Sequence, residues 1–187
     1  MKQYKEIVLS HETDQVASHQ PALIWAIENT SGDVLELGMG NCSTVLIHEL
    51  LKGTDRKILS IEDSSDWMNK FIHLESTNHQ FFSIERSVDS WKHKIDECSR
   101  FNWSVVFIDQ GYGEEIWRPT RNYAVQKLVQ CADFVVAHDA DVFPEMKSSE
   151  YNWIEYVPKY KAEPNRNGPP TYIFSKNHSL KDIHILE

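Results

Sequence analysis

The chain has 187 residues, of which 41% are hydrophobic, and its 28 acidic and 19 basic residues give a formal net charge of −9 at pH 7. This length suffices for one well-buried core and is short for two, so we expect a single domain over residues 1–187. The acidic balance leaves no basic stripe for a phosphate backbone, so long nucleic acid is not an expected partner.

The N-terminal part of the chain predicts a helix and no targeting segment. The first 15 residues contain no apolar core of signal-peptide length, and nowhere do about 18 apolar residues follow one another. We therefore expect no membrane anchor. Residues 18–32, SHQPALIWAIENTSG, fit a helix with Ser18 near its cap, Pro21 in its first turn and Gly32 after its end.

Strand-like and helix-like segments then alternate along the chain. Five short apolar runs predict strands buried on both faces: 33–37, 57–62, 81–85, 104–109 and 133–139. Four helical patterns accompany them: 43–53, 64–77, 89–101 and 120–132. This alternation predicts an α/β, Rossmann-like fold. Its doubly wound, mostly parallel sheet would have the order 3-2-1-4-5, with helices on both faces in a three-layer αβα sandwich.

Helix starts and the C-terminal segment complete the expected fold. The residues expected to cap the three helices after the first strand are Ser43, then Ser64 or Ser65, then Asp89 or Ser90. The aromatic, proline-punctuated region 151–177 predicts a loop and an antiparallel hairpin that closes the sheet edge. Its clearest strand is 171–175.

Residues 34–44, VLELGMGNCST, place two glycines where the first strand ends and a helix begins. In a doubly wound sheet, ligands bind beyond the carboxyl ends of the strands, where the crossovers change direction. Gly38 and Gly40 permit a tight turn and a close approach of the backbone to a ligand, and the following helix offers unpaired N–H groups. An ordinary strand-to-helix turn is the alternative.

Glu62 ends the second predicted strand and follows Gly38 by 24 residues. A ribose-binding acid is expected about 20 residues after a glycine fingerprint, and its carboxylate accepts hydrogen bonds from the ribose hydroxyls. The spacing predicts a ligand that contains a nucleoside. The alternative is that Glu62 or Asp63 caps the helix that follows.

Two features separate this loop from a dinucleotide site. Ser43 replaces the third glycine of a G-x-G-x-x-G fingerprint, and Glu36 precedes Gly38 by two residues. The loop instead resembles the first motif of the class I S-adenosylmethionine-dependent methyltransferases, in which an acid, one residue and G-x-G end the strand. The resemblance covers nearly the whole chain, because Glu62, the segment FIDQGYG with Asp109, and an antiparallel last strand also match. The segments VVFID and VVAHDAD resemble small, minimally decorated members of the group.

The resemblance implies S-adenosylmethionine as cofactor and S-adenosylhomocysteine as product. It places the methionine end against the glycine loop, the ribose on Glu62, and adenine near residues 86–89, where Trp91 either stacks on the base or belongs to the core. The cofactor-binding residues that it implies are Glu36, Gly38, Met39, Gly40, Asn41, Thr44, Glu62, Asp89, Trp91 and Asp109.

The chemistry would then lie beyond the fourth and fifth strands, which end in Asp109 and in His138 and Asp139. Methyl transfer from a sulfonium is an in-line displacement, so the enzyme aligns the acceptor and accommodates its proton. We expect these three residues to form the catalytic group, with O-methylation of a small molecule as the reaction. A pKa near neutrality suits His138 as a base; the alternative is a hydrogen-bonded residue in a buried strand end.

Asp109, Asp139 and Asp141 also resemble the ligands of metal-dependent O-methyltransferases, in which oxygen donors hold Mg²⁺ and lower the pKa of the acceptor hydroxyl. Ala140 stands where that family has an asparagine. We therefore favour a reaction without a metal, and Mg²⁺ at these three residues is the alternative.

The acceptor, the partners and the compartment are less constrained. Aromatic and arginine residues after the fourth and fifth strands, Arg121 among them, predict either an acceptor pocket or the interface of a homodimer. Three cysteines without a C-x-x-C spacing favour a reducing cytoplasm. Two other functions stay open: a catalytically inactive S-adenosylmethionine-binding partner or regulatory subunit, and an NAD-dependent oxidoreductase.

Overall fold

A seven-stranded sheet runs through the computed structural model, which describes residues 15–111, 113–139, 144–158, 161–163, 166–181, 183 and 185. Its strands are, in spatial order, β3 (His79–Ser83), β2 (Ile58–Glu62), β1 (Val34–Leu37), β4 (Trp103–Ile108), β5 (Ala132–Ala137), β9 (Thr171–Ser175) and β6 (Asn152–Tyr156). The first five strands are parallel, and β9 is antiparallel to both of its neighbours. The predicted strand order and the antiparallel edge are confirmed.

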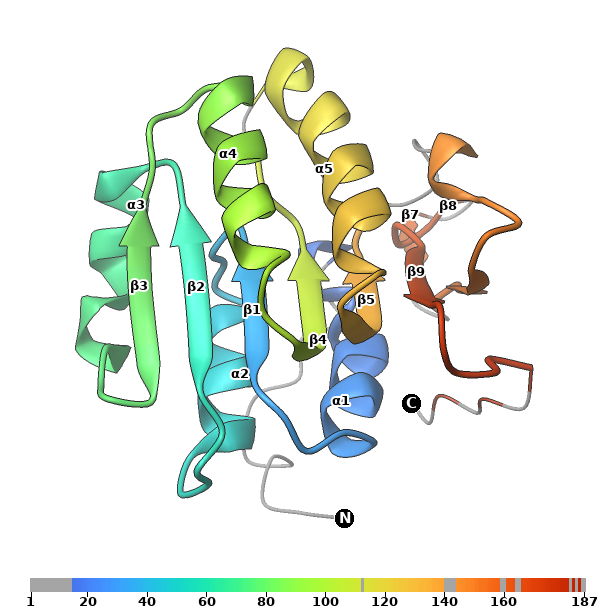
Figure 1. Ribbon diagram of the computed structural model, residues 1–187, viewed down its shortest axis with the longest axis horizontal. Helices are drawn as coiled ribbons and strands as arrows, with labels where there is room; N and C mark the ends of the chain where they lie inside the picture. The colour runs from blue at the N-terminus through green and yellow to red at the C-terminus, as the bar shows by residue number, and fades with distance from the viewer. Residues whose placement is uncertain are drawn as a thin grey trace.

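The register of the parallel strands brings their carboxyl ends to one edge, the upper end of β1 to β4 in Figure 1. Leu37 of β1 pairs with Ile61 of β2 and with Ile108 of β4, and Ile108 pairs with Ala137 of β5. The residues that end or follow these strands therefore leave the sheet side by side: Gly38, Glu62, Asp109 and His138.

Helices cover both faces of the sheet. In Figure 1, α4 (Val88–Cys98) and α5 (Glu114–Leu128) lie in front of it, and α1 (Gln20–Glu28) and α2 (Thr44–Leu51) lie behind it. The short helix α3 (Ser65–Met68) continues into the 3-10 helix η3 (Asn69–Leu74). Two further 3-10 helices are η2 (Gln15–Ala17) and η5 (Pro144–Met146). This is the predicted three-layer αβα sandwich, although α5 begins at Glu114 rather than at residue 120.

Two apolar clusters, one on each face, hold the helices to the sheet. Side chains alternate along a strand, so Leu35 and Leu37 of β1 join the cluster with α4 and α5, whereas Val34 joins the cluster with α1 and α2. Each fully buried leucine contributes about 1.5–3 kcal/mol. Glu36 shares the face of Val34, so the alternation turns this acid toward α2.

The third strand differs from its prediction. β3 occupies residues 79–83 instead of 81–85, and it is not buried on both faces, because it forms the edge of the sheet. Phe82 is 45% exposed, and the Lys94 ammonium of α4 lies 3.4 Å from the centre of its ring. A single covering helix and a charged side chain are typical of an edge strand.

The predicted helix caps agree in position at α1, α2 and α3 and differ at α4, since Ser18 directly precedes His19, the N-cap of α1, and Ser43 is the N-cap of α2. Ser64 caps α3, because its Oγ accepts a hydrogen bond from Trp67 N at 3.3 Å. Ser87 rather than Asp89 or Ser90 caps α4, through Ser90 N at 3.1 Å. Neither Ser43 nor Ser18 caps its helix with its side chain.

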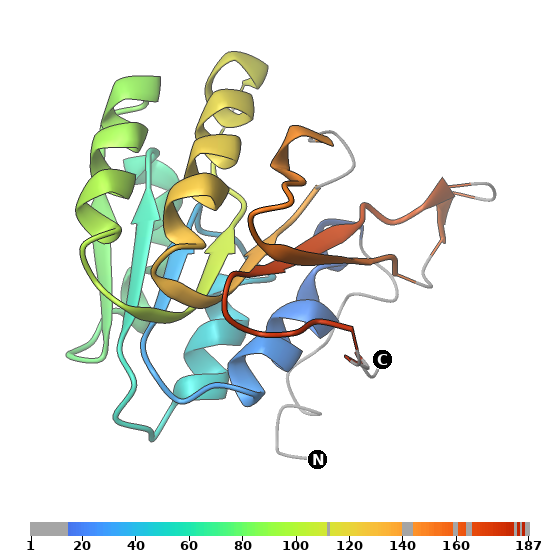
Figure 2. The same cartoon turned by 45° about the vertical axis from the view of Figure 1, so that its right-hand side comes forward.

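The predicted C-terminal hairpin is confirmed. β6 and β9 pair from Asn152↔Ser175 to Tyr156↔Thr171, and β9 joins the hairpin to β5. Between β6 and β9 in the chain, β7 (Lys161–Glu163) and β8 (Arg166–Asn167) form a separate two-stranded sheet, which extends away from the helices in Figure 2.

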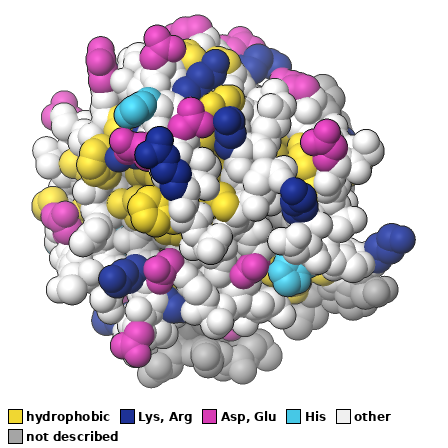
Figure 3. All heavy atoms as spheres, in the orientation of Figure 1, with side chains coloured by type: hydrophobic (Ala, Val, Ile, Leu, Met, Phe, Trp, Pro, Cys, Tyr) yellow, Lys and Arg dark blue, Asp and Glu magenta, His cyan; other side chains and the backbone are white. Residues whose placement is uncertain are grey.

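The surface mixes charges of both signs. On the face that Figure 3 shows, Lys and Arg side chains lie among Asp, Glu and apolar ones, without a continuous basic stripe in the part described. Within the described ranges, no helix combines the length and hydropathy that crossing a bilayer requires. Cys42, Cys98 and Cys131 are free thiols.

Candidate functional site

The glycine loop turns sharply after β1 and packs against the chain that follows β4. Gly38 has a φ of +87°, a backbone conformation that favours glycine, and a Cβ there would lie 2.5 Å from the backbone of Gln110. Gly40 has no positive φ, and a Cβ at that position would lie 3.2 Å from Ser43 Oγ. Gly38 is therefore required by the fold, whereas Gly40 keeps the loop surface free of a side chain.

Glu62 of β2 and Trp67 of α3 bind the backbone N–H and carbonyl of Met39 in the glycine loop. Glu62 Oε2 accepts from Met39 N at 2.9 Å, and Trp67 Nε1 donates to Met39 O at 2.7 Å. The other carboxylate oxygen of Glu62 accepts from Ser64 N at 3.0 Å. Burial raises the pKa of Glu62, and the Met39 amide opposes the rise. The capping alternative is thus partly realised, while ribose binding stays a prediction.

Glu36 lies beneath the loop and is closed off from solvent. Its carboxylate is fully buried and accepts hydrogen bonds from Thr44 Oγ1 at 3.0 Å and from Ser60 Oγ at 2.6 Å. Thr44 Oγ1 in turn accepts from Gly40 N at 2.9 Å. The expected direct contact between Glu36 and a ligand is therefore corrected: the face of β1 that carries it is covered by α2, and it reaches the loop only through Thr44.

The predicted adenine region is also corrected at one residue. Trp91 is fully buried in the cluster beneath α4, and its Nε1 donates to Asp63 Oδ2 at 3.0 Å. Its ring therefore belongs to the core and is not available for stacking on a base. Asp89 is exposed in the first turn of α4, and Asn41 is exposed in the glycine loop, so both keep side chains that a ligand can reach.

Beyond β4 and β5, a buried guanidinium links the two expected catalytic carboxylates. Arg121 of α5 donates through Nη2 to Asp109 Oδ1 at 2.8 Å and through Nε to Gln110 O at 2.8 Å. Its Nη1 lies 3.5 Å from Asp139 Oδ2. Burial acts to raise the pKa of Asp109, but Arg121 and His138 outweigh it and hold that pKa below its usual range.

The hydrogen bonds of His138 fix which ring nitrogen carries the proton. Ser18 has one hydroxyl proton, and Pro169 O, 2.9 Å away, can only accept it. Ser18 Oγ therefore accepts from His138 Nε2 at 2.9 Å, and Nδ1 faces Asp109 Oδ2 at 3.4 Å. Although Ser, His and Asp follow one another as in a hydrolase triad, the Ser18 proton points away from the histidine, so Ser18 is not an activated nucleophile.

The charges around His138 act on its pKa in opposite directions. Burial lowers the pKa, whereas Asp109 and Asp139 raise it, and the net change is upward. The Asp139 carboxylate lies 3.7 Å from His138 Nδ1 and its side chain is 41% exposed, against 4% for His138. The three expected catalytic residues thus meet, with Asp139 nearest to solvent and His138 enclosed.

His19, which the sequence analysis did not single out, completes the group. It directly precedes α1, is 1% exposed, and its ring centre lies 4.7 Å from those of Phe107 and His138. Among the described residues, neither ring nitrogen has a hydrogen-bond partner of normal geometry, although the Cys42 backbone interacts with the ring and opposes the fall of its pKa. Burial, followed by His138, lowers the pKa of His19 to about 3, which leaves the ring neutral.

Of the oxygen ligand set considered for Mg²⁺, the described residues include only Asp109 and Asp139, so Mg²⁺ binding stays an alternative that is not favoured. Arg121 already provides a cation to both Asp109 and Asp139. Asp141, the third expected ligand, lies outside the described residues. Mg²⁺ prefers six oxygen donors in octahedral geometry, and two carboxylates that share a guanidinium do not supply them.

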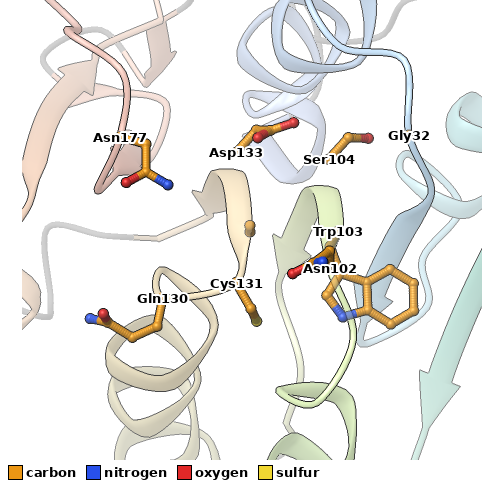
Figure 4. A pocket seen from close by; sticks show the side chains of 9 residues that line it. Gly32, Asn102, Trp103, Ser104, Gln130, Cys131, Asp133 and Asn177 are labelled. Atoms are coloured by element: carbon orange, nitrogen blue, oxygen red, sulfur yellow. The ribbon is translucent and has the colours of Figure 1, made fainter.

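A cavity of about 250 Å³ lies at the opposite edge of the sheet (Figure 4). Its lining includes Trp103 and Ser104 at the start of β4 and Ala132 and Asp133 at the start of β5. Because ligands of doubly wound sheets bind at the carboxyl ends of the strands, this cavity is not part of the site.

Comparison with known proteins bears on the fold. No protein-family model and no curated protein matches the sequence. A Klebsiella pneumoniae protein provisionally assigned as an O-methyltransferase is 13% identical, with a TM-score of 0.61 over 95% of this chain and 91% of that one. The O-methyltransferase TomG from Streptomyces achromogenes, solved with S-adenosylmethionine, is 13% identical, with a TM-score of 0.60 over 92% and 85%. SMU.1697c from Streptococcus mutans, a provisional methyltransferase solved with S-adenosylhomocysteine, is 12% identical, with a TM-score of 0.51 over 93% and 97%.

The chain has the class I methyltransferase fold. In this fold, Gly38, Glu62 and Asp109 end adjacent strands at the switch point, as the sequence predicted. At such identities the likeness establishes the fold alone, so the ligand and the reaction have to be argued from the residues themselves.

Proposed function

We propose that the chain is an S-adenosylmethionine-dependent methyltransferase that methylates an oxygen of a small molecule. The observation that carries the proposal is the meeting of the glycine loop and Glu62 at the switch point of a class I methyltransferase fold. The cofactors solved in TomG and SMU.1697c support the choice of ligand.

The loop and Glu62 have the groups that such a cofactor needs. When bound, S-adenosylmethionine supplies an electrophilic methyl group on a sulfonium. The backbone of Gly38, Met39 and Gly40 would bind the methionine end. Each carboxylate oxygen of Glu62 holds one backbone N–H and keeps a second lone pair, which can accept from the two ribose hydroxyls. Asp89 would lie nearest to adenine.

On the acceptor side, Asp139 is the group best placed to take the proton. Its backbone φ is 53° and its side chain is 41% exposed, whereas His138 lies behind it. The Asp139 carboxylate would accept the proton that an acceptor hydroxyl releases when its oxygen takes the methyl group. Arg121, His138 and Asp109 would position that carboxylate, and no metal ion contacts the acceptor in this proposal.

Cofactor binding without turnover is the second candidate, and one observation favours it. Arg121 lies 2.8 Å from Asp109 and 3.5 Å from Asp139, so both expected catalytic carboxylates already have a cationic partner. Arg121 holds the pKa of the Asp109 carboxyl below its usual range and so lowers the basicity of that group. An NAD-dependent oxidoreductase ranks third, because Ser43 replaces the third glycine of that fingerprint.

Two measurements separate these candidates. Calorimetry with S-adenosylmethionine should show binding to wild type and loss of binding in Gly40→Val, whose side chain would fill the loop surface, whereas NADH should not bind. Incubation with S-adenosylmethionine labelled in its methyl group and a metabolite extract should then transfer label to a small molecule. Asp139→Asn should bind the cofactor as wild type does and lower transfer by about 10² to 10⁴. Binding without transfer in wild type would select the second candidate, and no binding would reject the proposal.

The partners follow from the same proposal. The acceptor is a small molecule rather than a long nucleic acid, and the free thiols of Cys42, Cys98 and Cys131 support a reducing compartment such as the cytoplasm. Homodimerisation remains the alternative use of the exposed aromatic side chains, among them Trp153 of β6, which is 38% exposed.

A further inference from the structure

Two hydrogen-bond acceptors face each other beyond β4 and β5. The Nε2–H of His138 is committed to Ser18, because Ser18 gives its own proton to Pro169 O. The remaining nitrogen, Nδ1, has a lone pair and lies 3.4 Å from Oδ2 of Asp109, which can also only accept. A lone pair and a carboxylate oxygen at this distance repel each other unless a cation, either a proton or a metal ion, lies between them.

His19 brings a third donor to this pair from a different part of the chain. It is 1% exposed, and within the described residues both of its ring nitrogens lack a hydrogen-bond partner of normal geometry, with only the Cys42 backbone acting on the ring. One ring nitrogen of His19, one of His138 and one oxygen of Asp109 all lie within 4.8 Å of one another. Buried nitrogens without partners are rare in folded proteins, and an ion that binds them is a recognised reason for their presence.

The contacts around these side chains match those that surround metal ligands. A histidine that binds a metal donates its other ring N–H to a fixed acceptor, and a ligating carboxylate is held by further hydrogen bonds. His138 meets the first condition through Ser18, and Asp109 meets the second through Arg121 Nη2 at 2.8 Å from Oδ1. Arg121 thereby leaves Oδ2 free on the side that faces His138.

We propose that His19, His138 and Asp109 bind one divalent transition-metal ion. Two imidazole nitrogens and one carboxylate oxygen suit Zn²⁺, Co²⁺ or Fe²⁺, whereas Mg²⁺ and Ca²⁺ prefer oxygen donors. Donors at about 2.1 Å from a tetrahedral ion lie about 3.4 Å from each other, and His138 Nδ1 and Asp109 Oδ2 already have the separation of 3.4 Å.

This site differs from the Mg²⁺ set considered above, because it needs neither Asp139 nor Asp141. The ion would join the start of α1 to the ends of β4 and β5, and the Asp109 side chain, 26% exposed, leaves the group partly accessible to solvent. In the proposed methyl transfer it would hold His138 and Asp109 behind Asp139. The metal site does not rest on that function, since its donors are set by the fold alone.

Metal binding to protein without a histidine tag tests the proposal. Chelator-treated wild type is titrated with CoCl₂, followed by visible absorption, and with ZnCl₂, followed by calorimetry. We expect one ion per chain and a loss of affinity of more than about tenfold in His19→Asn. His48→Asn is the matched control, because it removes the other close histidine pair, in which the Nδ1 atoms of His48 and His79 lie 3.0 Å apart. It should bind the ion as wild type does.

His19→Asn should fold, since the ring nitrogens that it replaces make no hydrogen bond of normal geometry; the metal-free melting temperature checks this. If it does not fold, ring ¹⁵N resonances of the wild type decide. Zn²⁺ should shift the signals of both His19 and His138, whereas a proton shared by His138 and Asp109 predicts signals that Zn²⁺ leaves unchanged. Unchanged signals, the absence of a stoichiometric ion in wild type, or equal affinity in folded His19→Asn would overturn the proposal.

Discussion

Glu36→Gln should make the protein more stable above neutral pH. Glu36 is fully buried, and burial raises the pKa of its carboxyl from 4.5 to about 7, although the hydroxyls of Ser60, Ser43 and Thr44 oppose the rise. Between these two pH values the unfolded chain has lost the proton and the folded chain keeps it, so the free energy of unfolding falls as pH rises. Above about pH 7 Glu36 ionises in the folded chain too, and the free energy of unfolding then falls no further on its account.

The size of the effect follows from the two pKa values. With 4.5 in the unfolded chain and about 7 in the folded chain, the ionisation of Glu36 costs about 1 kcal/mol of stability at pH 5 and about 3 kcal/mol at pH 8. Glutamine does not ionise, so the variant should gain about 2 kcal/mol on wild type between these pH values. Altered hydrogen bonds to Ser60 and Thr44 act at both pH values and largely cancel in the comparison.

Urea unfolding of both proteins across this pH range measures the change. Glu49→Gln is the matched control, because Glu49 also lies on the α2 side but is partly exposed and pairs with Lys52 at 3.2 Å. The difference in the free energy of unfolding between Glu49→Gln and wild type should stay constant across this pH range. Parallel pH dependences for wild type and Glu36→Gln would refute the reasoning, since they would mean that Glu36 does not change its protonation between the folded and the unfolded chain in this range.

Two further changes test how the site is built. Gly38→Ala should cost more than about 2 kcal/mol in urea unfolding, because its φ of +87° and a Cβ 2.5 Å from Gln110 act together, whereas Gly53→Ala, with a φ of +76° and nothing within 4 Å, should cost about 1 kcal/mol. Equal losses of stability in the two variants would show that the contact between the added Cβ and Gln110 adds nothing to the cost of the positive φ. Arg121→Met should cost up to about 3–5 kcal/mol by leaving the partly buried Asp109 carboxylate, 26% exposed, without its cation, and Arg121→Lys should cost less. An unchanged free energy of unfolding in Arg121→Met would contradict that pairing.

The ligand edge could be predicted from the sequence because its signals are local. Short apolar runs mark the ends of β1, β2 and β4 to within one residue, as where the pattern predicts a strand over residues 33–37 and β1 spans Val34–Leu37, whereas β3 and β5 end two residues before their predicted ends. A glycine directly after one strand and an acid at the end of the next then fall at the same edge, since parallel strands point the same way. The order of the strands follows from right-handed crossovers between neighbouring elements.

Contacts between distant elements could not be predicted in the same way. Strand alternation places Glu36 on the face of the sheet opposite to that of Leu35 and Leu37. Only the packing of α2 shows that the face with Glu36 is covered. Arg121 lies on the same stripe of α5 as the buried Val125 and Leu128. That position usually holds an apolar residue, so an arginine there is a signal from which a buried ion pair could have been predicted.

Two acids hold the same loop from different sides, and this arrangement decides how cofactor affinity should respond to mutation. Glu62 binds Met39 N directly, whereas Glu36 reaches Gly40 N through Thr44. Donors that are fixed before the ligand arrives avoid the cost of ordering them on binding. Thr44, which the sequence predicted to contact the cofactor, is fully buried, so Thr44→Val removes the support of Gly40 and no ligand contact, whereas Glu62→Ala removes both support and the ribose acceptor. Calorimetry with S-adenosylmethionine should therefore show a loss of about 1–3 kcal/mol in Glu62→Ala and a smaller loss in Thr44→Val and Glu62→Gln. Equal losses in Glu62→Ala and Thr44→Val would show that the order of the loop, rather than contact with the ribose, sets the affinity.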